Sequence, residues 1–312
     1  MIPFFQQIHN IVLIMGKPAS HILTALFRHL RSRPTIEQVG VQPYRTLLEK
    51  NTLAFKPDPS IQTEPVMINS IEAQWLFPGN KMTPRVILYV HGGGFIAGSI
   101  LSHIDLAARI AAACDAKLLI FNYRLAPEHP FPEGLTDVRN VYEWLTAQYR
   151  DSHDIILAGD SAGAGLALSL LSGLLSDNYL LPSCSVLISP WIDLECKNPS
   201  HFENKEKDPM LSMDILKKTA ALYTDRDLSH HLISPVNNDF SGITPVLIQT
   251  GENEILVDDS KILAQNLKTA GATVELEIWE GMFHVWHYFA KYLPEGRGAI
   301  RQIGAFVRRH TS

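Results

Sequence analysis

Hydrophobic residues follow two alternating patterns along most of this chain. Short continuous apolar runs are typical of strands buried on both faces of a parallel sheet, and apolar residues spaced three and four positions apart predict amphipathic helices. The predicted strands cover 63–69 and 71–77, which form a hairpin, and then 86–90, 118–123, 155–159, 186–189, 246–250 and 274–279. Predicted helices between them cover roughly 104–113, 137–149, 162–175, 259–270 and 298–309. This alternation predicts a mainly parallel sheet with helices on both faces.

The alternation stops between residues 191 and 232. This stretch contains a helical pattern over 213–223 and is longer than an ordinary connection between a strand and a helix. Excursions of this length often carry a lid or a specificity element. We therefore expect an insertion at about 194–228 that covers part of a site.

The N-terminal segment also lies outside the sheet pattern. Apolar residues recur there at helical spacing at Ile22, Leu26 and Leu30, which predicts an amphipathic helix that covers another surface. A lid over a site explains this helix better than binding to a membrane surface does. We expect residues 1–45 and the insertion to form one helical cap on a catalytic domain that spans 46–312.

Composition and charge limit the classes of protein to which this chain can belong. Of 312 residues, 46% are hydrophobic and 19% are charged, which is ordinary for a globular protein with a sizeable core. The formal net charge is −5 and no long basic stretch is present, so we expect no nucleic-acid partner. The three cysteines are too few for a disulfide framework and fit a reducing compartment, which predicts a cytoplasmic protein.

The apolar run at 11–15 predicts neither a signal peptide nor stable insertion into a membrane. No basic residue precedes the run, and Lys17 ends it well short of a membrane span. The sequence leaves open whether the chain forms a homodimer.

The candidate chemistry begins with a serine between a predicted strand and a predicted helix. Ser161 is the centre of a G-x-S-x-G motif that runs from Gly159 to Gly163, and small residues are needed there because the backbone turns sharply. A glycine-rich segment, His91–Phe95, follows an earlier strand. A serine hydroxyl needs a base, an orienting carboxylate and amide donors for the oxyanion. The two motifs together predict an acyl-transfer site.

The base should lie after the last strand and before the last helix. His284 is in that position. In hydrolases whose G-x-S-x-G serine follows a strand of such a sheet, the order along the chain is nucleophile, acid, histidine. His287 gives a His-x-x-His spacing, but no cysteine or carboxylate cluster completes a metal site around it. We expect His284 to be the base and expect no metal or other cofactor.

The acid should lie in the loop after the strand 246–250. Four carboxylates compete there. Asp258 and Asp259 stand at the predicted start of a helix, where capping and the helix dipole explain acidic residues. Glu252 is nearest the strand and Glu254 is in the middle of the loop. We predict Glu254, with Asp258 as the alternative.

Several segments carry a resemblance to the bacterial hormone-sensitive-lipase-like esterases, a family of α/β-hydrolases. These segments are His91–Phe95, Tyr123–Pro132, Gly159–Gly163, Asp208–Leu211 and Gly281–His284. The resemblance implies an α/β-hydrolase fold with a mostly parallel eight-stranded sheet and a helical cap. It also implies hydrolysis of short to medium acyl esters, with a small-molecule ester as partner, without a cofactor and through an acyl-enzyme intermediate.

The resemblance further implies roles for individual residues. Ser161 would be the nucleophile and His284 the base, and the amides of Gly92, Gly93 and Ala162 would form the oxyanion hole. The sequence departs from the family at the acid, because Glu254 stands where many members have an aspartate. Glutamate can serve in the same chemistry. Separately, five apolar side chains near these motifs are candidates for an acyl pocket and equally for the core: Phe95, Trp191, Met210, Met282 and Phe283.

Other functions fit the sequence less well. Residues 92–97 also satisfy G-x-G-x-x-A, but in a dinucleotide-binding oxidoreductase that fingerprint follows the first strand, and an acidic residue ends the second. A non-catalytic binding protein of the same fold would usually lack a member of the triad. Hydrolysis of an amide, carbamate or lactone would use the same residues and remains an alternative.

Overall fold

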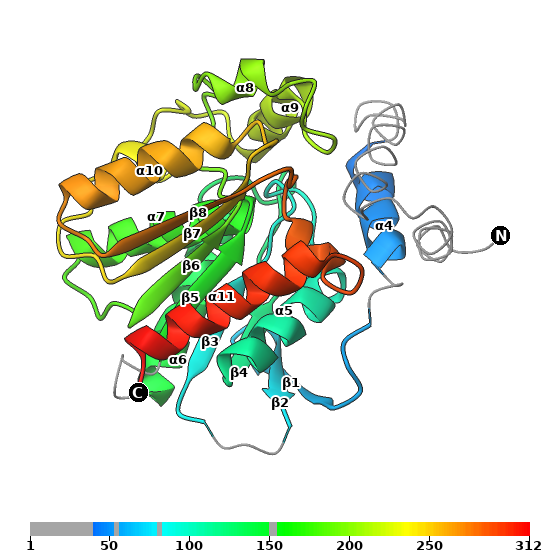
Figure 1. Ribbon diagram of the computed structural model, residues 1–312, viewed down its shortest axis with the longest axis vertical. Coiled ribbons are helices and arrows are strands. Elements are labelled where there is room, and N and C mark those ends of the chain that lie inside the picture. The colour runs from blue at the N-terminus through cyan, green and yellow to red at the C-terminus, as the bar shows by residue number, and fades with distance from the viewer. Residues whose placement is uncertain (1–39, 53–55, 80–82, 150–154) are drawn as a thin grey trace.

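Eight strands form one continuous sheet in the computed structural model, which describes residues 40–52, 56–79, 83–149 and 155–312 (Figure 1). The strands are β1 (Ile61–Ile68), β2 (Ile71–Pro78), β3 (Val86–Val90), β4 (Lys117–Phe121), β5 (Ile155–Asp160), β6 (Cys184–Ile188), β7 (Val246–Gly251) and β8 (Val274–Trp279). Their order in the sheet is β1-β2-β4-β3-β5-β6-β7-β8. Strands β1 and β2 form an antiparallel hairpin, β2 pairs antiparallel with β4, and all later pairings are parallel. The predicted α/β-hydrolase fold is confirmed.

Helices connect most of the strands in the part of the chain that the structure describes. They are α4 (Val41–Thr52), α5 (Ile100–Cys114), α6 (Glu133–Gln148), α7 (Ala162–Ser176), α8 (Ser200–Glu203), α9 (Met213–Tyr223), α10 (Val257–Thr269) and α11 (Pro294–His310), with short 3-10 helices η2 (Pro235–Asn237) and η3 (Trp286–Phe289). Helices α5, α6 and α11 begin about one turn before the predicted positions. Apolar spacing does not locate helix starts well, because caps set them: at α5 the Ser99 side chain accepts from the N–H of Ser102.

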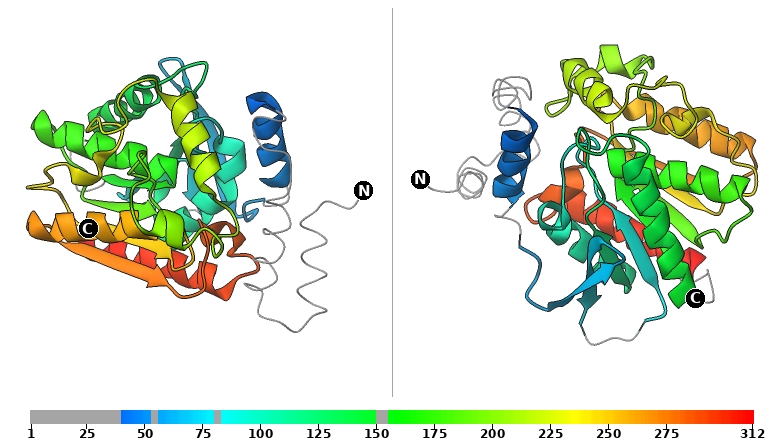
Figure 2. Two further views of the ribbon diagram at one scale, coloured as in Figure 1. Left: turned by 90° about the horizontal axis from the view of Figure 1, so that it is seen from above. Right: turned by 180° about the vertical axis from the view of Figure 1, so that it is seen from behind.

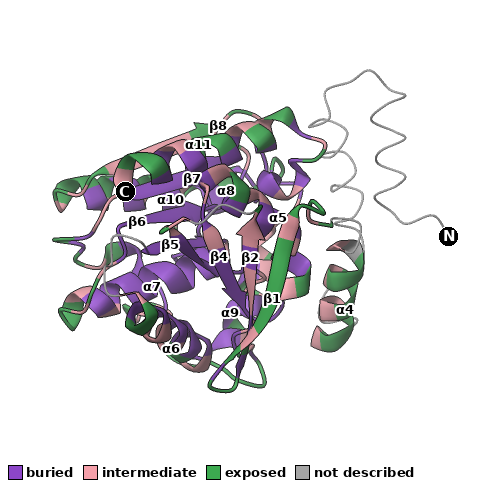
Figure 3. Ribbon diagram, turned by 90° about the horizontal axis from the view of Figure 1, so that it is seen from below, coloured by how far each residue is buried: buried purple, intermediate pink, exposed green. Residues whose placement is uncertain are grey.

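Alternate residues of the central strands contribute to two separate cores, because successive side chains of a strand point to opposite faces. Leu88 of β3 and Leu157 of β5 pack in the core formed with α6, α7 and α10. Ile87 of β3 and Ile156 of β5 pack in the core formed with α5 and α11. Figure 3 shows the middle strands buried and the edge strand β1 largely exposed. The sheet is therefore a rigid platform whose strand ends position loops.

Helices α4 and α9 lie at the end of the sheet where the parallel strands terminate (Figures 1 and 2). Arg45 of α4 donates hydrogen bonds to the carbonyl oxygens of Ile96, at 2.6 Å, and Ala126, at 2.8 Å. It also pairs with Glu128 at 2.7 Å. Helix α4 is thus bound to two loops, the glycine-rich one after β3 and the one after β4.

Most of the segment expected to form the N-terminal half of the cap, residues 1–39, lies outside the described residues. Helix α4 is its described end. Within the part of the chain that the structure describes, no helix is long and apolar enough to cross a membrane.

Candidate active site

Ser161 sits on the sharp turn between β5 and α7. Its backbone has φ 53° and ψ −124°, a conformation that a non-glycine residue adopts only when its surroundings impose it. Side chains at Gly159 and Gly163 would collide with neighbouring backbone, including the carbonyl of Val90. The two glycines therefore let β5 and α7 approach closely enough to present the serine hydroxyl at the end of the sheet.

A continuous chain of hydrogen bonds joins the three residues predicted to act together. Nε2 of His284 lies 2.9 Å from Oγ of Ser161, and Nδ1 of His284 lies 2.8 Å from Oε2 of Glu254. Glu254 is fully buried, His284 is 5% exposed, and Ser161 is partly exposed. The sequence separates these residues widely, and the ends of β5, β7 and β8 bring them together.

The second oxygen of Glu254 is held from several sides. Oε1 accepts hydrogen bonds from the Ser189 hydroxyl at 2.7 Å and from the backbone N–H of Gly251 at 2.5 Å. The Ser189 hydroxyl in turn accepts a bond from the N–H of Val285, next to His284, at 3.1 Å. This network fixes the carboxylate and the histidine loop relative to each other. Ser189 is a supporting residue that the sequence patterns did not single out, because a serine after a strand carries no distinctive signal.

The protonation of His284 reflects two opposed influences. Burial alone lowers the pKa of an imidazole, because it disfavours the charged form. The hydrogen bond and negative charge of Glu254 outweigh this effect, so the pKa of His284 is raised above its ordinary value. The imidazole is thus poised to accept a proton on the nitrogen that faces Ser161.

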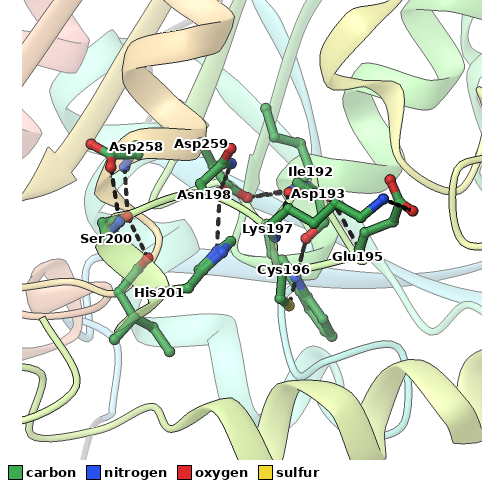
Figure 4. Close-up of polar contacts among 12 residues, drawn as sticks. Ile192, Asp193, Glu195, Cys196, Lys197, Asn198, Ser200, His201, Asp258 and Asp259 are labelled. Atoms are coloured by element: carbon green, nitrogen blue, oxygen red, sulfur yellow. Dashed lines mark hydrogen bonds and ion pairs between the residues drawn. The ribbon is translucent and has the colours of Figure 1, made fainter. Parts of the chain in front are cut away.

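The other candidate acids are engaged elsewhere. Asp258 accepts from the backbone N–H of Ser200 at 2.9 Å (Figure 4). It also pairs with Lys261. Asp259 accepts from the N–H of Asp193 at 3.1 Å. Both lie in the first turn of α10 but do not cap it, because the N-cap position is occupied by a leucine. Their structural role therefore differs from the capping role predicted.

Glu252 and His287 are also occupied away from the serine. Glu252 accepts from the N–H of Gly281 at 3.1 Å. Nε2 of His287 lies 2.8 Å from Oε1 of Gln249, and burial lowers the pKa of this histidine to about 3. His287 is therefore a buried structural residue.

The glycine-rich segment differs from the prediction at one residue. The backbone N–H of Gly92 points inward, where it donates to Oδ1 of Asp160 at 3.1 Å and lies 3.2 Å from Nε2 of His103. It is therefore not free to meet an oxyanion, and assigning Gly92 to the oxyanion hole was wrong. Gly93 and Gly94 instead line the cavity beside Ser161.

The remaining amide of the predicted oxyanion hole belongs to Ala162. It is the first residue of α7, and the first N–H groups of a helix have no partner within the helix. The amides of Gly93, Gly94 and Ala162 are therefore the donors that the geometry favours.

A cavity of about 280 Å³ opens above Ser161 and His284. Trp191 and Met210 line it as predicted, together with residues of α4 and α9 such as Leu48 and Ile215. Most of its lining is apolar, which suits an acyl group.

Three predicted pocket residues lie outside this lining. Phe95 is buried and stacks on Tyr223 with ring centroids 4.0 Å apart. Met282 and Phe283 are buried in a separate apolar cluster with Trp286. These assignments were wrong because proximity to a motif in the sequence does not show to which side of the loop a side chain turns.

Asp208 joins the insertion to the loop that carries the acid. Its Oδ1 accepts from the N–H groups of Met210 at 2.8 Å and Leu211 at 2.9 Å, and its Oδ2 accepts from the N–H of Ile255 at 2.9 Å. A single buried carboxylate therefore sets the position of a cavity-lining segment relative to Glu254.

Comparison with known proteins agrees with this architecture. Residues 87–288 match a family described as having the alpha/beta hydrolase fold. An acetyl-hydrolase of Streptomyces hygroscopicus is 39% identical over 87% of this chain and 91% of its own length. An esterase of Acinetobacter venetianus is 32% identical over 88% of this chain and 91% of its own length.

Solved structures show the same likeness. The crystal structure of an esterase from the bacterial hormone-sensitive lipase family superposes with a TM-score of 0.90 at 36% sequence identity, covering 96% of this chain and all of that one. A hormone-sensitive lipase from a metagenome library gives a TM-score of 0.90 at 29% identity, covering 94% of this chain and 98% of that one.

Proposed function

The chain belongs to the bacterial hormone-sensitive-lipase-like family of α/β-hydrolases, and on that premise we propose that it is a carboxylesterase that cleaves short to medium acyl esters with Ser161, Glu254 and His284. The observation that carries this proposal is the unbroken hydrogen-bond chain from Ser161 through His284 to Glu254 at the base of an apolar cavity. The curated relatives include an acetyl-hydrolase and an esterase, which supports ester bonds as the substrate class.

In the proposed acylation step, Oγ of Ser161 attacks the carbonyl carbon of the ester while its proton passes to Nε2 of His284. The negative charge that develops on the carbonyl oxygen is stabilised by the amides of Gly93, Gly94 and Ala162. Collapse of this intermediate breaks the bond to the alcohol, which takes the proton from His284. The acyl group then remains on Ser161.

Water completes the cycle by the same route in reverse order. His284 removes a proton from the water that attacks the acyl-enzyme, and returns a proton to Oγ of Ser161 when the acid leaves. Glu254 holds Nδ1–H of His284 in the tautomer that leaves Nε2 free as an acceptor, and stabilises the imidazolium formed in each step. Every role is filled by a side chain or backbone amide, so we expect turnover to survive chelation of metal ions.

The cap determines which acyl chains fit. Helix α4 contributes Tyr44 and Leu48 to the cavity, and α9 contributes Ile215 and Thr219. Because these side chains enclose the space above Ser161, we propose that α4 and the insertion limit acyl length.

A panel of nitrophenyl esters of graded acyl length, measured beside matched amides, tests the proposal. We expect the highest kcat/KM on short acyl esters and little turnover of amides, both unchanged by a chelator. Ile215→Trp should shift the profile toward shorter chains, with Leu180→Trp on an exposed site as control. Saturable binding of the esters without turnover would favour a non-catalytic binding protein, and faster amide than ester cleavage would favour another acyl bond.

A further inference from the structure

A buried cluster of metal-binding side chain types lies outside the catalytic cavity. Asp193 follows β6, His201 belongs to α8 and Asp259 lies in the first turn of α10 (Figure 4). One side-chain donor atom from each lies within 4.8 Å of the others. Asp193 is 6% exposed, and the other two residues are fully buried. None of the three lines the cavity of Ser161.

The buried imidazole of His201 faces a carboxylate at ion-pair distance. Its Nε2 lies 3.2 Å from Oδ1 of Asp259, yet neither ring nitrogen makes a hydrogen bond of good geometry with another described residue. Two ligands bound at ~2.0–2.1 Å to one tetrahedral metal ion are separated by about 3.3 Å. The contact therefore has the spacing of two ligands that share an ion.

The cluster also carries excess negative charge. Asp259 accepts from the N–H groups of Ile192 and Asp193, and Asp193 accepts from those of Glu195 and Lys197. These neutral donors orient the carboxylates but do not neutralise them. Buried carboxylates are costly unless a cation accompanies them.

Among the described residues, the only basic side chain that pairs with these carboxylates is His201 itself, so at most one positive charge faces two carboxylates. Neither Asp193 nor Asp259 forms an ion pair with a lysine or arginine there. Lys197, which is next to Cys196 in the same loop, directs its ammonium group to Glu195 instead.

We propose that Asp193, His201 and Asp259 form a binding site for a divalent cation of the zinc type. Two carboxylates and one imidazole are ligands that suit Zn²⁺ and its first-row neighbours, and a divalent charge would neutralise both carboxylates. Three protein ligands leave one position of a tetrahedral ion for a further ligand such as water. It lies apart from Ser161, so the ion would act on stability and not on the hydrolytic step.

Such an ion would join three segments around the acid loop. Next to His201, the Ser200 hydroxyl donates to the carbonyl of Ile255 at 2.7 Å, and Asn204 donates to the carbonyl of Glu254 at 2.9 Å. A metal bound to Asp193, His201 and Asp259 would therefore reinforce contacts between the insertion and the loop that carries Glu254. Ligands that bind only the folded state raise its stability.

Cobalt substitution tests the site independently of activity. Protein freed of metal with a chelator and dialysed would be titrated with Co²⁺, whose visible absorption reports bound nitrogen and oxygen ligands, and then with Zn²⁺ as competitor. We expect one equivalent of Co²⁺ to bind, Zn²⁺ to displace it, and Zn²⁺ to raise the Tm by a few degrees.

Matched variants distinguish this site from others. His201→Gln should abolish the absorption and the rise in Tm, whereas His129→Gln, at an exposed position, and His284→Gln, in the catalytic cavity, should keep both. Retained ester hydrolysis by His201→Gln would show that it folds, and Asp193→Asn provides a second test if it does not. Absence of Co²⁺ binding by the parent, unchanged binding by His201→Gln, or loss only in His284→Gln would each overturn the proposal.

Discussion

Two buried carboxylates near the start of α10, Glu254 and Asp259, each face a buried histidine, yet only one of these pairs contacts a reactive group. His284 and Glu254 meet at 2.8 Å, and His201 and Asp259 meet at 3.2 Å. The far nitrogen of His284 contacts the hydroxyl of Ser161 at an open cavity. His201 contacts no hydroxyl among the described residues and lies within the protein. A buried histidine–carboxylate pair is therefore not by itself evidence of catalysis, and the third partner and its access to a cavity decide the role.

The strongest test of the difference between the two pairs removes the hydroxyl of Ser161, which His284 contacts and His201 does not. Ser161→Ala should lower kcat by roughly 10⁴–10⁶-fold, because only the oxyanion amides and binding would remain to assist the reaction. Circular dichroism should show an unchanged fold, because the substitution removes only one partly exposed hydroxyl group. A Ser161→Ala enzyme as fast as the parent would contradict the proposed nucleophile.

The next test neutralises the carboxylate of the catalytic pair. Glu254→Gln keeps the size of the side chain but removes its charge, and should lower kcat by roughly 10²–10⁴-fold. Asp259→Asn, the equivalent change in the other pair, should leave kcat within a few-fold while lowering the Tm. Loss of turnover in Asp259→Asn at normal stability, with an active Glu254→Gln enzyme, would reverse the assignment.

The pH dependence sharpens the same comparison. His284 must be neutral to accept the proton of Ser161, and its pKa is raised by Glu254. The kcat/KM should therefore fall as the pH drops through a value above the ordinary histidine pKa of about 6.5. In Glu254→Gln the raising influence is lost and burial remains, so the acid limb should move to lower pH. Profiles with the same acid limb in both enzymes would show that this group is not the one that titrates.

The smallest effect is expected at Asp258, the partly exposed residue next to Asp259. Asp258 bonds the N–H of Ser200 and pairs with Lys261, and the loss of such contacts typically costs about 0.5–1.5 kcal/mol. Asp258→Asn should thus lower the Tm slightly and leave kcat unchanged. Asp214→Asn, on the exposed side of α9, is the matched control. A large fall in kcat would make Asp258 a candidate acid again.

The sequence contained enough signal to predict the sheet and the three residues of the hydrogen-bond chain. Continuous apolar runs such as Ile155–Leu157 mark buried strands unambiguously, and Ser161 and His284 follow strands at positions that the fold reserves for them. Glu254 could be separated from Asp258 because a residue in the middle of the loop lacks the structural explanation available at a helix start.

Orientation within loops could not be predicted. Three adjacent glycines give no indication of which amide faces the cavity, and Gly92 proved to face Asp160. Likewise, Phe95 and Met282 are apolar residues beside motifs, but both turn into the core. The cluster of Asp193, His201 and Asp259 is assembled by tertiary packing from residues with no shared spacing in the sequence.

The inward amide of Gly92 gives the site an internal reference for measurements of hydrogen exchange. It is buried and bonded to Asp160, whereas Gly93 and Gly94 are partly exposed at the cavity. Amides that are protected by buried bonds exchange slowly with solvent, and exposed ones exchange quickly. Occupancy of the oxyanion hole by an inhibitor should therefore slow exchange at Gly93 and Gly94 while Gly92 stays slow throughout. Three consecutive residues would then report, in a single peptide, whether a compound reaches the reactive centre or merely binds the protein elsewhere.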